Sequence, residues 1–428
     1  MKPKPFFNRQ ALHLSPDPSR VVVRPFRPAV EPRDLNPVDK TRANHIVDRV
    51  LALNESQVEA LLSATLDNFD GRHRNLLATF KRRADEMEEA FASHAGFSEK
   101  RCQLVGAYFL NEYSFEAAAL FNPSIVPHPD QSGVAEGCRR FILSLRALGE
   151  GHISSLTFRS GIVAADGTVT IDPPARLASV PKVDARVGDR LDLSFDPEGD
   201  ITERVIFPIT EMQANGIEDA RFVAFQESGS TTYYATYTAY SGREIRSELL
   251  ETRDFLSFHM APLKGTAARN KGMALFPRKI GGRYAMLGRH DNENLYLLYS
   301  DKLHEWGDGM AILKPEYPWE FVQIGNCGSP IELDEGWLVF THGVGPIRRY
   351  AIGAVLLDKD DPSKVIGRSR EPLVQPEKTE REGYVPNVVY SCGAMQVGER
   401  IVLPYAISDT FSTFATMRTR ELLELLKF

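Results

Sequence analysis

The chain has 428 residues, of which 43% are hydrophobic and 25% are charged, an ordinary globular composition that excludes a largely disordered protein. Its 51 basic and 57 acidic residues give a net charge of −6, so the chain has no general positive footprint for nucleic acid. The N-terminal sequence lacks the apolar run of a secretory signal, and no apolar stretch is long enough to span a bilayer. We therefore expect a cytoplasmic protein without membrane or nucleic-acid partners.

The cysteines and the short motifs exclude several further classes of protein. The four cysteines are far apart and never approach a C-x-x-C spacing, so we expect reduced thiols rather than a zinc site or a disulfide framework. The sequence motifs of P-loop nucleotide hydrolases, zincins, α/β-hydrolases and dinucleotide-binding proteins are missing. We accordingly expect no metal and no other cofactor.

The first quarter of the chain reads as an arm followed by helices. Residues 1–36 are rich in proline and arginine, and we expect an extended arm around Val21-Val22-Val23. Ser56 is expected to cap a second helix, and a third is expected from about Arg72 to His94. The first helix is predicted from apolar residues at helical spacing, namely Ala43, Ile46, Val47, Val50 and Leu51. The arm and an α-helical accessory region thus span residues 1–118.

Residues 119–428 have the texture of many short β-strands broken by Gly, Pro and Asp. A unit of two strands recurs five times in this region. From the second unit onward, successive units start 56, 54 and 57 residues apart, and the longer interval between the first and second units indicates an insertion. The five starts are Asn122, Asp219, Leu275, Ser329 and Pro386. This recurrence predicts a mainly β protein whose catalytic domain is a five-bladed β-propeller with an N-terminal α-helical extension and a C-terminal helix in MRTRELLELLKF. A β-sandwich with accidental spacing is the alternative.

Polar residues stand at the ends of the predicted inner strands, where propeller blades converge on one funnel. Asp219 opens a strand and could serve as a catalytic acid, although an aspartate in the turn before a strand is equally ordinary. Two cations, an imidazole and a phenol are the kinds of donor that bind an oxyanion such as phosphate. These expected phosphate ligands are Lys271, Arg289, His342 and Tyr350. Taken singly, the two cations also fit solvated turns, and His342 fits a buried hydrogen-bonded histidine.

A further set of residues is expected to contact the substrate. The candidates, from the first, second and last predicted sheets, are Asn122, Arg146, Arg159, Glu218 and Asp409. Arginine at a strand end could bind sugar hydroxyls or phosphate, but it is usually a surface residue. Asp409 could bind a sugar diol or could cap the following turn.

Several motifs in order carry a family resemblance. They are NPSIV, IEDARF, KGMALFPRKIGGRYAMLGR, YSDKLHEW, GSPIELDEGWLVFTHGV, YAIGAVLLDKDDPSKVIGRS, VPNVVYSCG and YAISDT. The series resembles the blade motifs of glycoside hydrolase family 130, the β-mannoside phosphorylases, over roughly residues 119–415, about seventy percent of the chain. The helical N-terminal region lies outside it.

The resemblance implies an inverting phosphorylase, a glycosyltransferase-type enzyme that cleaves a β-mannoside with inorganic phosphate to give α-mannose 1-phosphate and an acceptor sugar. Asp219 matches the general acid of the family's E-D-P-R motif, whose proton reaches the glycosidic oxygen through a hydroxyl of the bound mannose. Lys271, Arg289, His342 and Tyr350 match the family's phosphate ligands, and phosphate is then a co-substrate rather than a cofactor. Two departures are Ala220 in place of proline and lysine at Lys271, where arginine is common.

Two alternatives remain open from the sequence. The first is a β-mannosidase of the same fold, and the second is a glycan-binding propeller without activity. In each case the partner is a small mannoside. The helical N-terminal region is expected to cover one face or to support a homo-oligomer.

Overall fold

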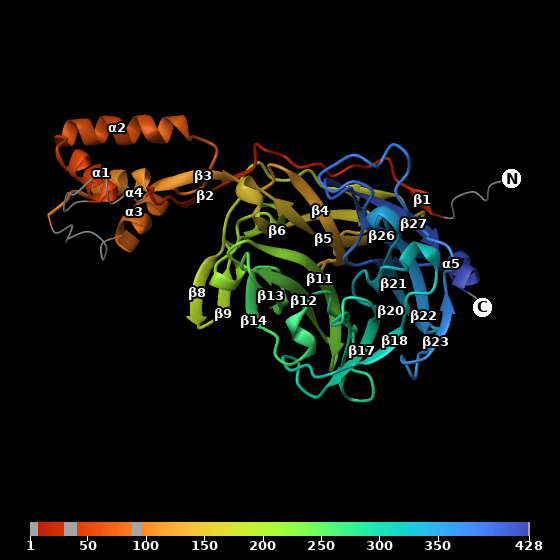
Figure 1. Ribbon diagram of the computed structural model, residues 1–428. Helices are drawn as coiled ribbons and strands as arrows, with labels where there is room; N and C mark the ends of the chain where they lie inside the picture. Colours follow the sequence, from red (N-terminus) through yellow and green to blue (C-terminus); the bar gives the residue numbers. More distant parts are fainter. Residues whose placement is uncertain (1–6, 30–40, 88–95, 427–428) are drawn as a thin grey trace. The chain divides into compact units, whose positions relative to one another are not determined.

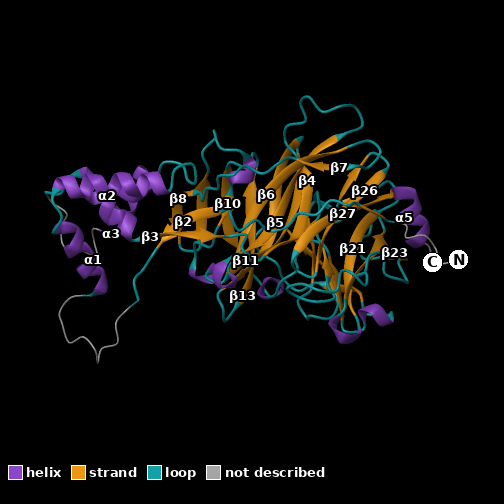
Figure 2. Ribbon diagram, turned by 90° about the horizontal axis from the view of Figure 1, so that it is seen from above, coloured by secondary structure: helices purple, strands orange, loops and turns teal. Residues whose placement is uncertain are grey.

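The computed structural model describes residues 7–29, 41–87 and 96–426. The chain divides into two compact units, of which unit 1 comprises Met1–Pro18, Phe115–Ala175 and Val180–Phe428. Unit 2 comprises Ser19–Ser114 and Arg176–Ser179. The described part has five α-helices. Figures 1 and 2 show that it is mainly β-structure. None of the helices in these residues is long and apolar enough to cross a membrane.

The described residues of unit 2 form four helices and one pair of strands. The elements are α1 (Arg42–Leu51), α2 (Glu55–Asn68), α3 (Leu76–Met87), α4 (Glu99–Tyr108), β2 (Val21–Pro25) and β3 (Leu110–Ser114). The helical spacing in the sequence predicts α1 correctly, because its apolar residues Val47 and Val50 are buried in the core of this unit. The valine run predicted as an extended arm forms β2, which pairs antiparallel with β3.

Two helix boundaries in unit 2 differ from the prediction. The N-cap of α2 is Asn54 rather than Ser56, because the Asn54 side chain accepts a hydrogen bond from the backbone N–H of Gln57 and the Gln57 side chain accepts one from the backbone N–H of Asn54. The third helix begins at Leu76, four residues later than expected, and the remainder of its predicted range after Met87 lies outside the described residues.

Residues 7–18 belong by their contacts to unit 1, whereas the sequence prediction placed all of residues 1–118 in the accessory region. The reason is strand pairing, since β1 (Asn8–Arg9) pairs antiparallel with β27 (Phe411–Arg418) near the other end of the chain. Backbone hydrogen bonds between Leu14 and Ser412 continue this attachment.

Unit 1 contains four sheets, all of whose described pairings are antiparallel except for one. The longest joins β4 (Ala119–Pro127), β5 (Arg139–Leu148), β6 (Ser154–Val163), β11 (Gly216–Glu227), β12 (Ser230–Tyr240), β13 (Ile245–Thr252), β14 (Ser257–Pro262), β9 (Arg190–Ser194) and β8 (Lys182–Val187), with β7 (Val169–Ile171) and β10 (Val205–Ile206) beside β6. The exception is the contact of β6 with β11, which is parallel and pairs only Gly216 with Ser154.

The other three sheets follow in chain order. One contains β15 (Ala274–Leu275), β16 (Tyr284–Gly288), β17 (Leu295–Ser300) and β18 (Met310–Leu313). The next contains β19 (Gln323–Asn326), β20 (Ile331–Glu332), β21 (Trp337–Val344), β22 (Tyr350–Leu357) and β23 (Val365–Arg368). The last contains β24 (Val389–Tyr390), β25 (Met395–Val397), β26 (Arg400–Ile407), β27 and β1. Helix α5 (Thr419–Leu426) is the last element of the described chain. It begins two residues later than the start of the predicted helical run, because Met417 and Arg418 still belong to β27.

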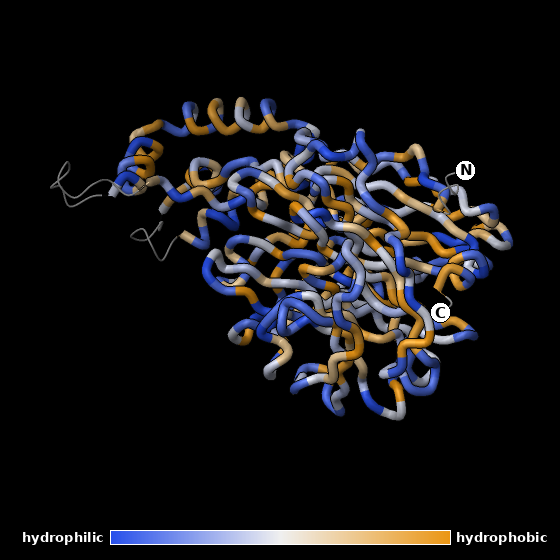
Figure 3. The backbone as a smooth tube through the Cα atoms, turned by 45° about the vertical axis from the view of Figure 1, so that its right-hand side comes forward, coloured by the Kyte–Doolittle hydropathy of each residue, from blue (hydrophilic) through white to orange (hydrophobic). Residues whose placement is uncertain are grey.

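Several strands are buried along nearly their whole length, as β4 and β21 are. Figure 3 shows hydrophobic stretches running through the β region between hydrophilic loops. One core cluster is rich in phenylalanine: Phe158 packs edge-on against Phe222 and Phe255 with ring centroids 6.1 and 5.8 Å apart. This cluster lies in the sheet that carries Asp219, so the strand bearing the candidate acid stands on a closely packed base.

Candidate active site

Asn122 and Asp219 stand at two interruptions of strand pairing. The register of β4 with β5 shifts at Asn122, and that of β11 with β12 shifts at Asp219. Their φ angles of 50° and 53° are left-handed, a conformation that Asn and Asp adopt more readily than most residues. A bulge turns a side chain out of the regular alternation. Here the Asn122 Nδ2 donates a hydrogen bond of 2.7 Å to the Asp219 Oδ1, so the two bulges meet.

Arg146, on β5, joins both carboxylates of the predicted motif. Its Nη2 donates to the Glu218 Oε1 at 2.6 Å, and its Nη1 donates to the Asp219 Oδ1 at 3.1 Å. Its Nε donates to the Ser154 hydroxyl at 2.7 Å, which fixes the plane of the guanidinium. The structure thus brings together four of the residues predicted from sequence, and Arg146 is partly buried beside two carboxylates rather than a solvated surface charge.

The surroundings of Asp219 and Asp409 shift the pKa values of these two carboxyl groups in opposite directions. Burial opposes ionisation of Asp219, but the positive charges of Arg146 and Lys271, with the hydrogen bond from Asn122, outweigh burial and lower the pKa of Asp219. Burial and then the negative charge of Asp219 raise the pKa of Asp409 to about 6. Near neutral pH the site therefore holds an ionised Asp219 beside Asp409, a carboxyl group that takes up a proton more readily than an ordinary aspartate.

The raised pKa predicts that Asp409 destabilises the folded protein above about pH 6. Between the ordinary value of 3.8 and about 6, the unfolded carboxyl is ionised while the folded one keeps its proton, so wild-type stability falls across this window. Asp409→Asn should therefore match the wild type in its free energy of unfolding below the window and exceed it above the window by up to about 3 kcal/mol. Urea unfolding at about pH 3, below the window, and at about pH 8, above it, measures the difference; an equal difference at both pH values would contradict this assignment.

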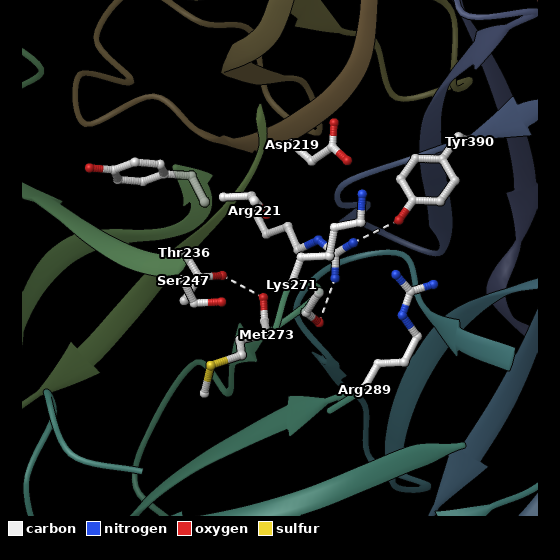
Figure 4. A pocket seen from close by; sticks show the side chains of 11 residues that line it. Asp219, Arg221, Thr236, Ser247, Lys271, Met273, Arg289 and Tyr390 are labelled. Carbon is white, nitrogen blue, oxygen red and sulfur yellow. Dashed lines mark hydrogen bonds between the residues drawn. The ribbon is translucent and has the colours of Figure 1, made fainter. Parts of the chain in front are cut away.

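A small pocket, with a cavity volume of about 10 Å³, lies beside Asp219. The charged side chains that line it are Asp219, Arg221, Lys271 and Arg289, and Figure 4 shows them around a common space with Tyr390. Lys271 stands just before β15 and Arg289 just after β16, so adjacent strands of one sheet deliver the two cations that the sequence predicted as phosphate ligands. Three cations facing one carboxylate leave the pocket positively charged.

His342 and Tyr350 extend this cationic side through the next sheet. The Arg289 Nη1 lies 3.1 Å from the His342 Nε2. Burial, followed by the charges of Arg289 and Arg221, lowers the pKa of His342 well below its usual value, so the neutral ring accepts this hydrogen bond. The Tyr350 ring stacks on His342 with centroids 6.0 Å apart and an interplanar angle of 11°. Two of the four predicted phosphate ligands, Lys271 and Arg289, therefore line the pocket. The other two, His342 and Tyr350, follow Arg289 in a chain of contacts.

Arg159 is not brought to this cluster, so its prediction as a substrate ligand requires correction. Its side chain is 3% exposed and pairs with Glu116, which is fully buried, at 2.8 Å. Its remaining hydrogen bonds go to the Thr157 hydroxyl and the Phe158 carbonyl within its own strand. A buried arginine with its carboxylate partner is a structural ion pair, and sequence spacing could not show that Glu116 lies opposite.

Three neighbouring residues were missed by the sequence reasoning. Arg221 and Tyr390 line the pocket, and both stand in motifs that had been singled out, IEDARF and VPNVVYSCG. Gln323 places its side-chain amide 3.4 Å from the His342 Nε2. The sequence signal available for Arg221 was its position two residues after Asp219, on the same side of a regular strand.

The comparisons with known proteins concern mainly unit 1. A family model for glycoside hydrolase family 130, described as β-1,4-mannooligosaccharide phosphorylase, matches residues 191–428. A 1,2-β-oligomannan phosphorylase of Thermoanaerobacter sp. (strain X514) is 36% identical over 220 residues, which cover 50% of this chain and 72% of that protein. A β-1,2-mannobiose phosphorylase of Listeria innocua is 32% identical over 232 residues, covering 52% of this chain and 63% of that protein.

Solved structures show the same fold. The β-1,2-mannobiose phosphorylase of Listeria innocua in complex with β-1,2-mannobiose superimposes with a TM-score of 0.53 at 22% identity, covering 72% of this chain and 92% of that chain. A putative glycoside hydrolase of Parabacteroides distasonis gives a TM-score of 0.54 at 19% identity, covering 74% and 90%.

The family match begins after the first sheet strands but includes most of the pocket. Asp219, Lys271, Arg289, His342 and Asp409 lie within it, whereas Asn122 and Arg146 precede it. The match covers more than half of the chain. The order of motifs, the fold of unit 1 and this match agree, and the chain belongs to glycoside hydrolase family 130.

Proposed function

We propose that the protein is an inverting phosphorylase that cleaves a β-mannoside with inorganic phosphate, giving α-mannose 1-phosphate and an acceptor sugar. The observation that carries the proposal is one pocket lined by Asp219, a candidate acid, and by Lys271 and Arg289, two cations from a neighbouring sheet. Hydrolysis needs only an activated water, whereas an anionic nucleophile needs several convergent positive groups. Because the two relatives described above are named for β-1,2-linked mannosides, we place β-1,2-mannosides first among the substrates.

We also propose that unit 1 is a five-bladed β-propeller. Its strands fall into five antiparallel groups once the longest sheet is divided at the single-residue parallel contact of β6 with β11: β4–β7 with β10, β11–β14 with β8 and β9, β15–β18, β19–β23, and β24–β27 with β1. The pairing of β1 with β27 ties the N-terminal residues into the last group, a closure that would remove an exposed sheet edge. Such an arrangement would deliver strand ends from every group to the same pocket.

In the proposed reaction the two sides of the pocket have different tasks. Asn122, Arg146, Glu218 and Asp409 surround Asp219 and would hold the hydroxyl groups of the mannosyl unit. Lys271, Arg289, His342 and Tyr350 would hold phosphate so that one of its oxygens attacks the anomeric carbon. The new C–O bond forms as the glycosidic bond breaks, and the leaving oxygen receives the proton of Asp219 through a mannose hydroxyl.

The low pKa of Asp219 in the unliganded site makes phosphate binding part of this mechanism. Lys271 is among the charges that lower that pKa. A bound phosphate dianion would offset the positive charge of Lys271 and add negative charge nearby, so it would raise the pKa of Asp219 toward a value suited to a proton donor. The ionised carboxylate would thus acquire its proton when the second substrate arrives.

The proposal is tested in the synthetic direction. Purified protein is incubated with α-mannose 1-phosphate and a panel of acceptors comprising glucose, mannose, N-acetylglucosamine and β-1,2-mannobiose, and released phosphate is measured. Phosphate release with one acceptor class, and none without acceptor, is expected. Silence across the panel, together with release of mannose from β-mannosides in phosphate-free buffer, would replace the phosphorylase by a β-mannosidase; binding of mannosides without any product would favour a glycan-binding propeller.

A further inference from the structure

Arg221 connects three separate parts of the pocket. It stands on β11 two residues after Asp219, just beyond the bulge, and only 3% of its side chain is exposed. Its Nη1 donates to the Gly272 carbonyl at 2.6 Å, and its Nη2 donates to the Tyr390 hydroxyl at 2.8 Å. Figure 4 shows both hydrogen bonds spreading from one guanidinium toward β24 and toward the turn that carries Lys271.

The bond to Gly272 fixes the backbone on which Lys271 is mounted. Gly272 has a φ of 93°, which a side chain would strain, and the position of its absent Cβ lies 3.5 Å from the Arg221 Nη1 and 3.7 Å from the Arg289 Cβ. On the other side, the backbone N–H of Lys271 donates to the Asn270 side chain. The turn is therefore held between Arg221 and Asn270 and packed against Arg289.

The bond to Tyr390 reaches the remaining two predicted phosphate ligands. The Tyr390 ring lies 4.9 Å from the His342 ring and 6.2 Å from the Tyr350 ring, centroid to centroid. A phenol whose hydroxyl is fixed by a buried guanidinium cannot rotate away from these rings. One side chain thus sets the position of groups from three sheets.

The two hydrogen-bond acceptors of Arg221 explain why this residue can hold its neighbours in place without losing its charge. Both are neutral, a carbonyl and a phenol, so the positive charge of Arg221 is not cancelled by a carboxylate hydrogen-bonded to it. Removing a buried hydrogen-bonded group leaves its partners without hydrogen bonds in a region from which water is largely excluded. The loss should therefore loosen Gly272 and Tyr390 together.

We propose that Arg221 is a positioning residue that preorganises the phosphate side of the pocket by holding the Lys271–Gly272 turn and Tyr390 in place. The proposal rests on the phosphorylase function above and assigns to Arg221 no contact with the reacting atoms. Its consequence is selective: loss of Arg221 weakens phosphate binding and leaves mannoside binding, on the opposite side of Asp219, largely intact.

The test compares Arg221→Lys and Tyr390→Phe with Arg204→Lys. Arg204 is a matched control, because it is also a buried arginine, 8% exposed, that donates to neutral carbonyls, those of Phe255 and Gly199, and it does not line the pocket. We expect the KM for phosphate to rise about tenfold in Arg221→Lys and about threefold in Tyr390→Phe. The KM for the mannoside should stay within about twofold in both variants, and neither constant should change in Arg204→Lys.

Calorimetric titration of each folded variant with inorganic phosphate alone provides a readout that does not depend on turnover. Weaker phosphate binding in Arg221→Lys and Tyr390→Phe, against wild-type binding in Arg204→Lys, supports the proposal. Unchanged phosphate affinity in Tyr390→Phe and Arg221→Lys overturns it, as does an equal loss of phosphate and mannoside affinity. A wild-type protein that binds phosphate but never turns over a mannoside would instead defeat the proposed function while leaving this inference standing.

Discussion

Asp219→Asn is expected to lower kcat for phosphorolysis of a β-mannoside by about 10³-fold, the scale of losing a general acid. The asparagine keeps the size of the side chain and can still meet Asn122 and Arg146, but it has no proton to give. The loss of kcat in the variant should be smaller for a substrate whose leaving group needs no protonation. A dinitrophenyl β-mannoside should therefore be cleaved by the variant at a rate much closer to that of the wild type.

The control for this substitution is Asp334→Asn. Asp334 is a fully exposed aspartate that does not line the pocket, and its loss should leave kcat and both KM values unchanged. Full turnover of an ordinary β-mannoside by Asp219→Asn would remove Asp219 from its proposed role. A uniform loss with both leaving groups would assign Asp219 to binding or folding rather than to proton transfer.

Arg289→Gln is expected to lower kcat/KM for phosphate by about 100-fold, because a charge-assisted ligand of the anion is replaced by a neutral amide. The KM for the mannoside should change little. A second effect follows from electrostatics: the Arg289 charge helps to lower the pKa of His342, so that pKa should rise in the variant. Phosphate-dependent initial rates and NMR titration of the histidine measure the two effects.

Arg283→Gln provides the matched control for Arg289. Arg283 immediately precedes β16, whereas Arg289 follows it, and Arg283 is exposed beside the Tyr299 ring. The substitution at this other end of the strand should leave phosphate kinetics unchanged. Equal effects of the two variants, or an Arg289→Gln enzyme with wild-type kcat/KM for phosphate, would contradict the assignment of Arg289 to the phosphate side.

The sequence predicted elements best where a periodic pattern decided them. The apolar spacing that gives α1 and the short apolar runs of the strands after residue 119 are properties of short segments, so they could be seen without the fold. The pairing of β1 with β27 and of β2 with β3 joins segments far apart in the chain, and no local pattern records it. The N-cap of α2 was missed because two polar residues compete there and Asn54 has the partner, Gln57.

In the candidate site, too, local sequence predicts some residues, whereas the positions of others depend on segments far apart in the chain. Asp219, Lys271 and Arg289 could be proposed from recurring strand ends, and the fold places all three in one pocket. Arg159 has the same local sequence character as Arg146, yet one meets a buried Glu116 and the other meets Asp219. Which carboxylate stands opposite an arginine depends on tertiary structure, and so does the bridging position of Arg221.

The central claim is that phosphate, not water, takes the mannosyl group with inversion. The most direct test is to follow cleavage of β-1,2-mannobiose by proton NMR, with and without inorganic phosphate, and to identify the first anomer formed. We predict α-mannose 1-phosphate and an equal amount of mannose with phosphate present, and no cleavage without it. Free mannose formed at the same rate in both samples, or β-mannose 1-phosphate as the first product, would contradict the account.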